Sequence, residues 1–262
     1  MKNRMQEEFS GKDKKEPVRL NKYLAESGVC SRREADRLIE QGRVTVDGQT
    51  AAMGLKVLPI QDIRVNGKPV SREEEMILLA VNKPVGIICT SEKKWGSNNI
   101  EEFLHYPKRI FSIGRLDKDS EGLLLMTNNG EILNKIMRAG NYHEKEYEVK
   151  VNRPVTDEFI RQMEKGVPIL NTVTRPCRVE KMGEKQFRII LTQGLNRQIR
   201  RMCEALGFKV TRLVRVRIMN IHLGHLKAGT YRKLTDKEIE ELYRLIQDSS
   251  NGPAKAHLQK GS

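Results

Sequence analysis

The chain has 262 residues and a globular composition, enough to bury one large hydrophobic core or two smaller ones. Its 48 lysines and arginines exceed its 34 aspartates and glutamates, and the formal net charge of +14 attracts polyanions such as nucleic acid. The four cysteines form no CxxC pair, which argues against a disulfide framework or a zinc finger. No apolar stretch suits a signal peptide or a membrane span, so we expect a cytoplasmic protein. The only close histidine pair, His222 and His225, has no cysteine or carboxylate at ligand spacing, so we expect no metal and no other cofactor.

Residues 1–16 form a polar leader, and a first folded module is predicted over residues 17–70. Leu20–Leu24 has the apolar spacing of a short helix. Ser31–Glu34 matches a capping box, in which a hydroxyl and a carboxylate satisfy the free backbone amides at the start of a helix. A second helix is therefore expected from there to about Gly42, where a glycine can end it.

Two short strands are predicted to complete this module. Val44–Val46 and Ile63–Val65 alternate apolar and polar side chains, and each precedes an Asp-Gly or Asn-Gly pair that favours a tight turn. Three arginines lie opposite the apolar stripe of the second helix: Arg32, Arg33 and Arg37. They indicate either an ordinary solvated face or a surface for RNA.

A second, larger module is predicted over residues 76–247, with 71–75 as a linker and 248–262 as a flexible tail. Strand and helix patterns alternate through this module, beginning with an apolar strand at Met76–Val81. Near its end, Thr235–Glu238 is another capping box and heads a helix. The side chains expected to face inward from that helix are Ile239, Leu242, Leu245 and Ile246.

One carboxylate, Asp117, lies in a tight polar loop between two apolar runs, Ile110–Ile113 and Leu123–Met126. Gly114 and Gly122 flank it and permit backbone conformations that other residues avoid. A polar loop held by two strands suits either an ordinary turn or the presentation of a reactive group.

Positive charge is concentrated farther along the chain. A strand is expected from Lys145, with Tyr147 on its core side, and a helix over residues 197–206 after the loop Thr192–Asn196. Between residues 188 and 217 the basic residues are Arg188, Arg197, Arg200, Arg201, Lys209, Arg212, Arg215 and Arg217, against the single acid Glu204. A merely solvated face would mix its signs, so this region favours contact with nucleic acid.

Together these motifs resemble the RsuA-type bacterial pseudouridine synthases, in the branch acting on large-subunit ribosomal RNA, the RluF type. The segments that carry the resemblance are Leu20–Leu24 with Ser31–Asp36, Asn82–Gly86, Gly114–Asp117, Lys145–Tyr147 and Gly194–Arg201. The resemblance implies an α+β fold, with a small N-terminal S4-type RNA-binding domain of two helices plus short strands. The pseudouridine synthase catalytic domain that follows would have a mixed, mainly antiparallel central sheet flanked by helices.

The resemblance also implies roles for single residues. Asp117 corresponds to the catalytic aspartate, Arg115 to the arginine associated with holding RNA as the target base leaves its stack, and Tyr147 to the tyrosine that packs on uracil. Arg200 corresponds to the basic residue that pairs with the aspartate, and Arg197 is the alternative because helix phase does not decide between them. The expected RNA contacts are Arg32, Arg33, Arg37, Lys83, Arg197 and Arg201, although the motif that holds Lys83 is also expected to support the site.

The implied reaction cuts the bond from ribose to uracil N1, turns the base and joins C5 to the same sugar carbon, without redox change or metal. Asp117 could attack the sugar carbon or the base ring, or help to remove the 2′ proton, and the sequence leaves these open. An adjacent arginine would keep a buried carboxylate ionised, and the tyrosine ring would hold the detached base. The uridine must first be flipped out of its helix.

Two other functions fit parts of the sequence. Asp117–Ser120 matches the start of haloacid-dehalogenase-type phosphatases, but Gly114 and Arg115 interrupt the apolar strand that those enzymes need, and no acidic pair for magnesium follows a strand. An RNA-binding or ribosome-assembly factor without catalysis would not require Asp117, Tyr147 and Arg200 together. The substrate expected is a uridine in a stem-loop of 23S ribosomal RNA, with transfer RNA left open, for an enzyme that is a monomer and needs no protein partner.

Overall fold

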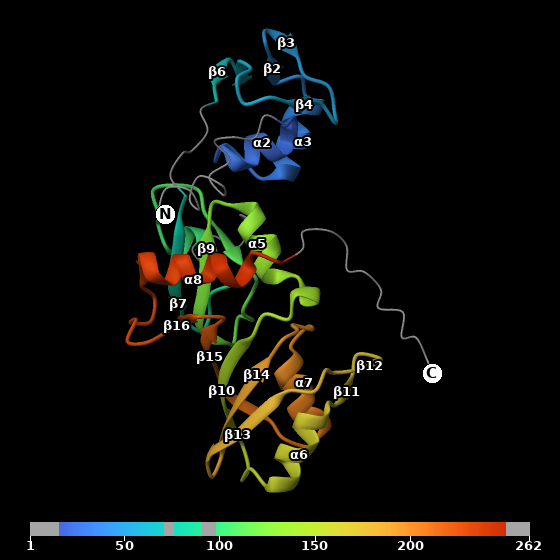
Figure 1. The fold of residues 1–262 in the computed structure, drawn as a ribbon, viewed down its shortest axis with the longest axis vertical. Helices are drawn as coiled ribbons and strands as arrows, with labels where there is room; N and C mark the ends of the chain where they lie inside the picture. The colour runs from blue at the N-terminus through green and yellow to red at the C-terminus, as the bar shows by residue number, and fades with distance from the viewer. Residues whose placement is uncertain (1–15, 71–75, 91–97, 250–262) are drawn as a thin grey trace. The chain divides into compact units, whose positions relative to one another are not determined.

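The computed structural model describes residues 16–70, 76–90 and 98–249 (Figure 1). The predicted linker 71–75, nearly all of the leader 1–16 and most of the tail 248–262 lie outside the described residues. The chain divides into two compact units. The first contains the residues up to Ile77 and the short segments 106–110 and 127–130, and the second contains the rest.

The first unit begins with two helices, α2 (Leu20–Glu26) and α3 (Arg32–Glu40), where the sequence predicts them. The Ser31 hydroxyl accepts a hydrogen bond from the Glu34 backbone amide at 3.2 Å, which is one half of the predicted capping box. The Glu34 carboxylate instead forms an ion pair with Arg37 at 3.4 Å. Helix α3 therefore starts as expected, with a single side-chain cap.

A four-stranded sheet, in the order β3-β2-β5-β6, covers these helices. Its strands are β2 (Val44–Val46), β3 (Gln49–Thr50), β5 (Ile63–Val65) and β6 (Lys68–Pro69). Strands β2 and β5, both predicted from the sequence, pair with each other and run antiparallel. A further pair, β1 (Val18–Arg19) with β4 (Lys56–Val57), is not predicted, because two residues are too few to show a period.

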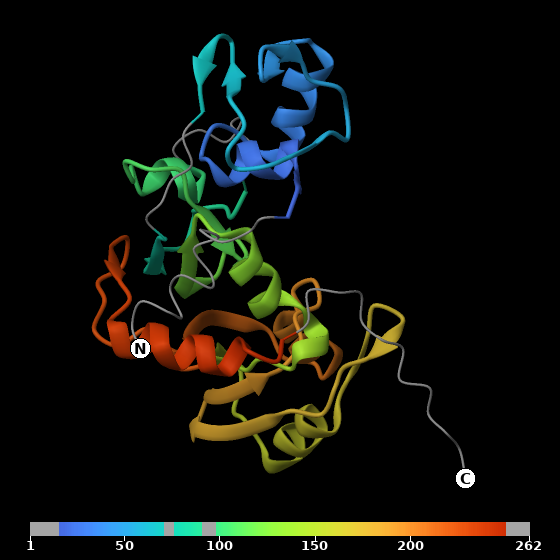
Figure 2. The ribbon, with the colours of Figure 1, turned by 45° about the horizontal axis from the view of Figure 1, so that its top comes forward.

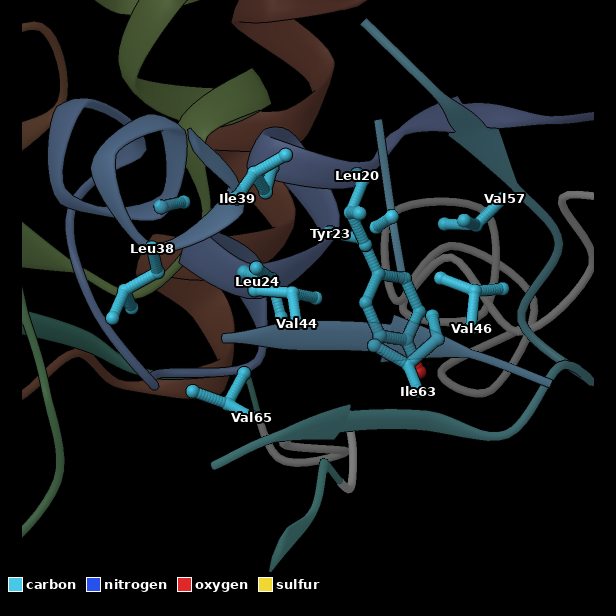
Figure 3. Close-up of a cluster of buried hydrophobic side chains, with 12 residues drawn as sticks. Leu20, Tyr23, Leu24, Leu38, Ile39, Val44, Val46, Val57, Ile63 and Val65 are labelled. Atoms are coloured by element: carbon cyan, nitrogen blue, oxygen red, sulfur yellow. The ribbon is translucent and has the colours of Figure 1, made fainter. Parts of the chain in front are cut away.

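The core of this unit lies between the helices and the sheet (Figure 3). The ring of Tyr23 lies among aliphatic side chains of α2, β2 and β5, including Leu20 and Ile63. On α3 the buried residues are Ala35, Leu38 and Ile39. Burial of this stripe leaves Arg32, Arg33 and Arg37 exposed on the opposite face, as predicted.

The second unit is built on a nine-stranded sheet in the order β13-β14-β10-β15-β9-β7-β17, with β16 paired to β15 and β8 to β9 (Figures 1 and 2). The strands are β7 (Leu78–Lys83), β8 (Phe111–Ile113), β9 (Glu121–Thr127), β10 (Lys145–Val151), β13 (Arg178–Gly183), β14 (Gln186–Leu191), β15 (Val210–Ile218), β16 (Ile221–His222) and β17 (Tyr231–Lys233). Strand β10 runs antiparallel to both β14 and β15, whereas β15 and β9 are parallel. The expected mixed, mainly antiparallel sheet is confirmed.

Helices and one short hairpin surround this sheet. They are α4 (Ile100–Phe103), α5 (Gly130–Met137), α6 (Asp157–Lys165), α7 (Gln198–Ala205) and α8 (Asp236–Ile246), with the hairpin β11 (Pro168–Ile169) and β12 (Thr172–Val173) and a 3-10 turn at Ala139–Asn141. Helix α6 contacts β13, and α7 contacts β15 and β11 (Figure 1). Within the described ranges, no helix is long and apolar enough to cross a membrane.

Helix α8 corrects one detail of the sequence analysis. Its capping box at Thr235 and Glu238 is complete, as predicted. Leu242 and Ile246 are buried, but Leu245 is exposed and Tyr243 is buried in its place. Positions 239, 242, 243 and 246 follow the spacing of one helical face, whereas position 245 falls on the next face. For burial on α8, the position of a residue around the helix is therefore a better guide than its hydrophobicity.

Candidate active site

The loop that carries Asp117 joins β8 to β9, which confirms the predicted strand-loop-strand arrangement. Gly114 has φ +79°, and a Cβ there would lie 2.6 Å from the Met137 sulfur, so the position favours glycine. The Ser120 amide donates to the Asp117 carbonyl at 3.0 Å and closes a tight turn. These backbone features alone thus set the position of Asp117 in the loop.

The segment from Asn82 to Gly86 supports this turn through hydrogen bonds. The Lys83 ammonium donates to the Ser120 carbonyl at 2.7 Å and to the Pro84 carbonyl at 2.9 Å, and the Gly86 amide donates to the Lys118 carbonyl at 2.8 Å. Lys83 is fully buried, and this burial lowers the pKa of its ammonium. Such a side chain does not reach RNA, so the expected RNA contact at Lys83 is corrected to support of the loop.

Above the turn lies a cleft of about 430 Å³. Its charged and aromatic lining residues are Arg115, Asp117, Lys145, Tyr147, Arg197, Arg200 and Arg215. Asp117 is the only carboxylate among the residues that line it. The Asp117 side chain is 33% exposed, and Tyr147 is 9% exposed on β10. A carboxylate open to the cleft and an aromatic ring are thus brought together, as the sequence predicts.

The arginine next to Asp117 is not the expected one. An Arg197 guanidinium nitrogen lies 3.7 Å from the Asp117 carboxylate, whereas the Arg200 guanidinium lies 3.3 Å from the carboxylate of Asp119. Arg200 also donates to the Asp119 carbonyl at 2.8 Å and the Ser120 hydroxyl at 3.3 Å. The geometric expectation that Arg200 pairs with Asp117 is therefore wrong, and Arg197, the alternative, occupies that place.

The backbone at the start of α7 explains this difference. Arg197 is the N-cap residue and has φ 50° and ψ 35°, a left-handed conformation that is uncommon outside glycine. This conformation lets its side chain extend to the 117–119 loop. Arg200 lies inside the first turn of the helix and is held by backbone carbonyls, including that of Val210 at 3.3 Å. A helical projection of the sequence treats both residues as helical, so it misses the left-handed backbone of Arg197.

Asp119 is the residue of the site that sequence reasoning missed as a functional group. The Arg197 guanidinium makes two hydrogen bonds to its carboxylate, at 2.9 and 3.0 Å. These bonds, together with the nearby Arg200, lower the pKa of Asp119. The only sequence signal was an acid two positions after Asp117, and it suggested a phosphatase motif instead. Asp119 therefore links both arginines to the Asp117 loop.

The remaining predicted residues are distributed as follows. Arg115 is exposed and lines the cleft beside Asp117. Arg201 is half-buried and donates to the carbonyl and the side-chain oxygen of Asn196, both at 3.1 Å, so it stabilises the loop before α7. The three arginines of α3 belong to the first unit.

Comparison with known proteins agrees with this arrangement. A model of the RNA pseudouridylate synthase family matches residues 77–205, and a model of the S4 domain matches residues 18–58. The dual-specificity RNA pseudouridine synthase RluF of Escherichia coli K12 is 55% identical over 236 residues, covering 89% of this chain and 81% of the relative. Ribosomal large subunit pseudouridine synthase B of Bacillus subtilis is 38% identical, covering 89% of this chain and 98% of the relative.

A solved structure supports the same assignment. A crystal structure of a pseudouridylate synthase superposes with a TM-score of 0.64 at 29% identity, covering 86% of this chain and 99% of that one. Both the sequence relatives and this fold match extend across the two units. The chain therefore belongs to the RNA pseudouridine synthases, as a member of the RsuA type with an N-terminal S4 domain, in the branch that contains RluF.

Proposed function

We propose that this pseudouridine synthase isomerises a specific uridine of 23S ribosomal RNA in the cytoplasm, as a monomer, with Asp117 as its catalytic carboxylate. The observation that carries the proposal is that Asp117 and Tyr147 line one cleft, with Arg197 3.7 Å from the carboxylate. Arg197 places a positive charge beside the carboxylate, and the Tyr147 ring supports the flipped uracil. Arg115 stands at the exposed side of the cleft, where it can hold the RNA strand.

Asp117 acts on the flipped nucleotide at the start of the reaction, when the bond between C1′ and N1 breaks. The carboxylate is partly exposed to the cleft and is bordered by cations, which suits either a nucleophile or a base at the sugar. Asp117 and the cleft are features that a pure RNA-binding factor has no need of, and this favours catalysis over that alternative.

The choice of 23S ribosomal RNA rests on the relatives. One is named a ribosomal large subunit pseudouridine synthase, and another a dual-specificity RNA pseudouridine synthase. Transfer RNA, which the sequence leaves open, is the second substrate to examine. The S4 domain, with the exposed Arg32 and Arg33 on α3, would supply contacts to RNA outside the cleft.

Pseudouridine mapping tests this proposal directly. Total RNA is compared between cells with the gene, cells without it, and deleted cells that express Asp117→Asn. We expect one site, or a small set, in 23S ribosomal RNA to lose its pseudouridine on deletion and to stay unmodified with the variant. A signal confined to transfer RNA would contradict the substrate assignment, and restoration by Asp117→Asn would contradict the role of Asp117.

A further inference from the structure

Two buried cations line the cleft, and neither has an acidic partner among the residues that the structure describes. Lys145 on β10 is 7% exposed, and Arg215 on β15 is 2% exposed. Within the described parts of the chain, no carboxylate lies within ion-pair distance of either one. Burying a charge without a counter-charge costs free energy, so a fold that keeps two of them in one site is expected to use them.

The contacts of Arg215 leave part of its guanidinium unused. Its Nε donates to the Leu123 carbonyl at 2.7 Å, and Nη1 donates weakly to the Arg115 carbonyl at 3.4 Å. Its Nη2 is buried and has no hydrogen-bond partner among the residues that the structure describes. The guanidinium carbon lies 6.0 Å from the centre of the Tyr147 ring, so the group borders the surface on which a base would stack.

Lys145 is held just as loosely. Its only hydrogen bond within the described residues is to the His143 carbonyl at 3.5 Å, the outer limit of such a contact. Burial, with a smaller effect from the charge of Arg215, lowers the pKa of the ammonium to about 8. The two positive charges therefore repel each other in a site with little access to water.

The neighbouring arginines of β15 show that the chain supplies acids where a structural pair is needed. Arg217 pairs with Glu146 at 2.7 Å and with Glu144 at 2.9 Å, and Arg212 pairs with Glu121 at 2.5 Å. Arg215 lies between them on the strand, on the side of the cleft, and lacks such a partner in the described chain. The missing anion is therefore expected to come with the substrate.

We infer that Lys145 and Arg215 form an oxyanion site for the detached uracil, binding the negative charge that develops on its carbonyl oxygens when the glycosidic bond breaks. This inference rests on the proposed function and deepens it. The site lies on the Tyr147 side of the cleft, where the base is expected to stack, while Asp117 serves the sugar. The charge is thus met by donors that are already fixed before the reaction.

The charge balance follows from the reaction. When the bond between C1′ and N1 breaks, its electron pair stays on N1 and spreads over O2 and O4 of the uracil anion, while Asp117 compensates the positive charge at the sugar. The two cations hold the anion without transferring a proton. After rotation, the C5=C6 electron pair forms the bond from C5 to C1′, C5 loses its proton and N1 gains one, so the product is an isomer of the substrate.

A backbone phosphate is the other anion that such a site could bind, and timing separates the two ligands. A phosphate is charged in the bound substrate before any chemistry, so its contacts contribute to affinity. The uracil anion exists only after bond cleavage, so its contacts lower the barrier and leave ground-state binding unchanged.

Lys145→Met provides the main test because methionine nearly matches the length of lysine and removes a buried charge. Single-turnover release of tritium from uracil C5 and the dissociation constant for RNA are measured on the full chain. We expect a fall of about 10²-fold or more in the rate, an unchanged dissociation constant, and partial rescue by Lys145→Arg. Lys150→Met removes an exposed lysine from the same strand and serves as the matched control.

A better leaving group gives an independent readout. With 5-fluorouridine at the target position, the detached anion is more stable by itself, so cleavage in Lys145→Met should be impaired less than with uridine. Chromatography and mass spectrometry of the digested nucleosides measure that cleavage. An equal defect with both substrates, a loss of RNA affinity that matches the loss of rate, or a fully active Lys145→Met would each overturn the inference.

Failure of the proposed function would look different. A wild-type enzyme that is inactive on every RNA would overturn the proposed function and this inference together. An active wild-type enzyme with an unaffected Lys145→Met variant would overturn the inference alone. Thermal unfolding of each variant confirms that a lost rate does not come from a lost fold.

Discussion

Asp119 joins two of the arginines that line the cleft, Arg197 and Arg200, to the loop of Asp117. Arg197 meets its carboxylate with two hydrogen bonds, and Arg200 meets its carboxylate and its carbonyl. The sequence could predict a cation beside Asp117, because several arginines occur near α7. It could not predict which arginine, because no local sequence pattern records the left-handed backbone of Arg197.

Asp119→Asn should therefore impair catalysis more than stability. The amide keeps the shape of the side chain but loses the charge that orients both guanidinium groups, so we expect the turnover rate to fall about tenfold or more. The carboxylate is half exposed, so the free energy of unfolding should change by less than about 1 kcal/mol. Steady-state kinetics and thermal unfolding measure the two effects.

The control for this variant is Glu158→Gln, which removes an exposed ion pair with Arg161 on α6 in the same unit. Its activity should match that of the wild type. Comparable losses of activity in Asp119→Asn and Glu158→Gln would show that Asp119 has no special place in the site.

Lys145 makes a pH-dependent contribution to stability. Burial, then Arg215, lowers its folded-state pKa to about 8, and the groups that face it are Arg215, the His143 carbonyl and the ring of Tyr147. Between about pH 8 and the pKa of Lys145 in the unfolded chain, the unfolded chain binds a proton that the folded chain does not. Relative to Lys145→Met, the wild type should therefore gain up to about 1.4 kcal/mol per pH unit as pH rises through this window.

Urea unfolding of both proteins at about pH 7 and about pH 10 measures this difference. At the lower pH, Lys145→Met should be at least as stable as the wild type, since it removes a buried unpaired charge. A stability difference that is the same at both pH values would show that Lys145 keeps an ordinary pKa in the folded protein.

At the scale of elements, the parallel contact between β9 and β15 holds Arg215, which lines the cleft. Gly122 pairs with Arg215, has φ +105°, and an added Cβ would lie 2.4 Å from the Arg215 carbonyl oxygen. This close approach lets the Arg215 guanidinium reach the Leu123 carbonyl. The sequence indicated that Gly122 mattered for its loop, but the reason lies in a strand more than ninety residues away.

Gly122→Ala should push β9 away from β15. We expect a loss of about 2 kcal/mol in the free energy of unfolding, from strain in the backbone and from overpacking, together with a large loss of activity. Gly194→Ala is the matched control, since Gly194 also lines the cleft and an added Cβ there meets no atom within 4 Å. Denaturant unfolding and turnover assays compare the two, and equal stabilities would contradict the role given to this strand contact.

Elements with a clear period were predicted well, whereas strands of two residues were not. Strand β10 alternates over seven residues and α8 carries a complete capping box, so both could be found from the sequence. The pairs β1–β4 and β11–β12 have two residues a strand and owe their existence to packing. Asp117 and Tyr147 could be predicted because sequence motifs mark them. The roles inferred for Lys145 and Arg215 depend on the lack of a nearby carboxylate among the described residues, and only a structure can reveal that.

At the scale of the whole molecule, a chain with a net charge of +14 contains a catalytic unit and an S4 domain. Cations near RNA phosphates release condensed counterions, so each contact adds to the salt dependence of binding. Arg32 and Arg33 are exposed, and within the described residues no ion pair engages them. They are therefore available to contact RNA phosphates from this face of α3.

The double variant Arg32→Gln with Arg33→Gln should weaken RNA binding and lower the slope of log affinity against log salt by about 1.5. Turnover at saturating RNA should stay near the wild-type value, because the cleft is untouched. Arg64→Gln serves as the control, since Arg64 is exposed in the same domain but paired with Asp62 at 2.8 Å. An unchanged salt slope in the double variant would contradict an RNA-binding role for this face of α3.

The central claim is that Asp117 carries out isomerisation on RNA bound in this cleft. The most direct measurement compares purified wild type and Asp117→Asn on the same RNA, scoring pseudouridine by carbodiimide modification and primer extension, and affinity by titration. We predict that Asp117→Asn binds RNA as tightly as the wild type and forms no detectable pseudouridine in a single turnover. Pseudouridine formed by Asp117→Asn at a rate near that of the wild type would contradict the claim.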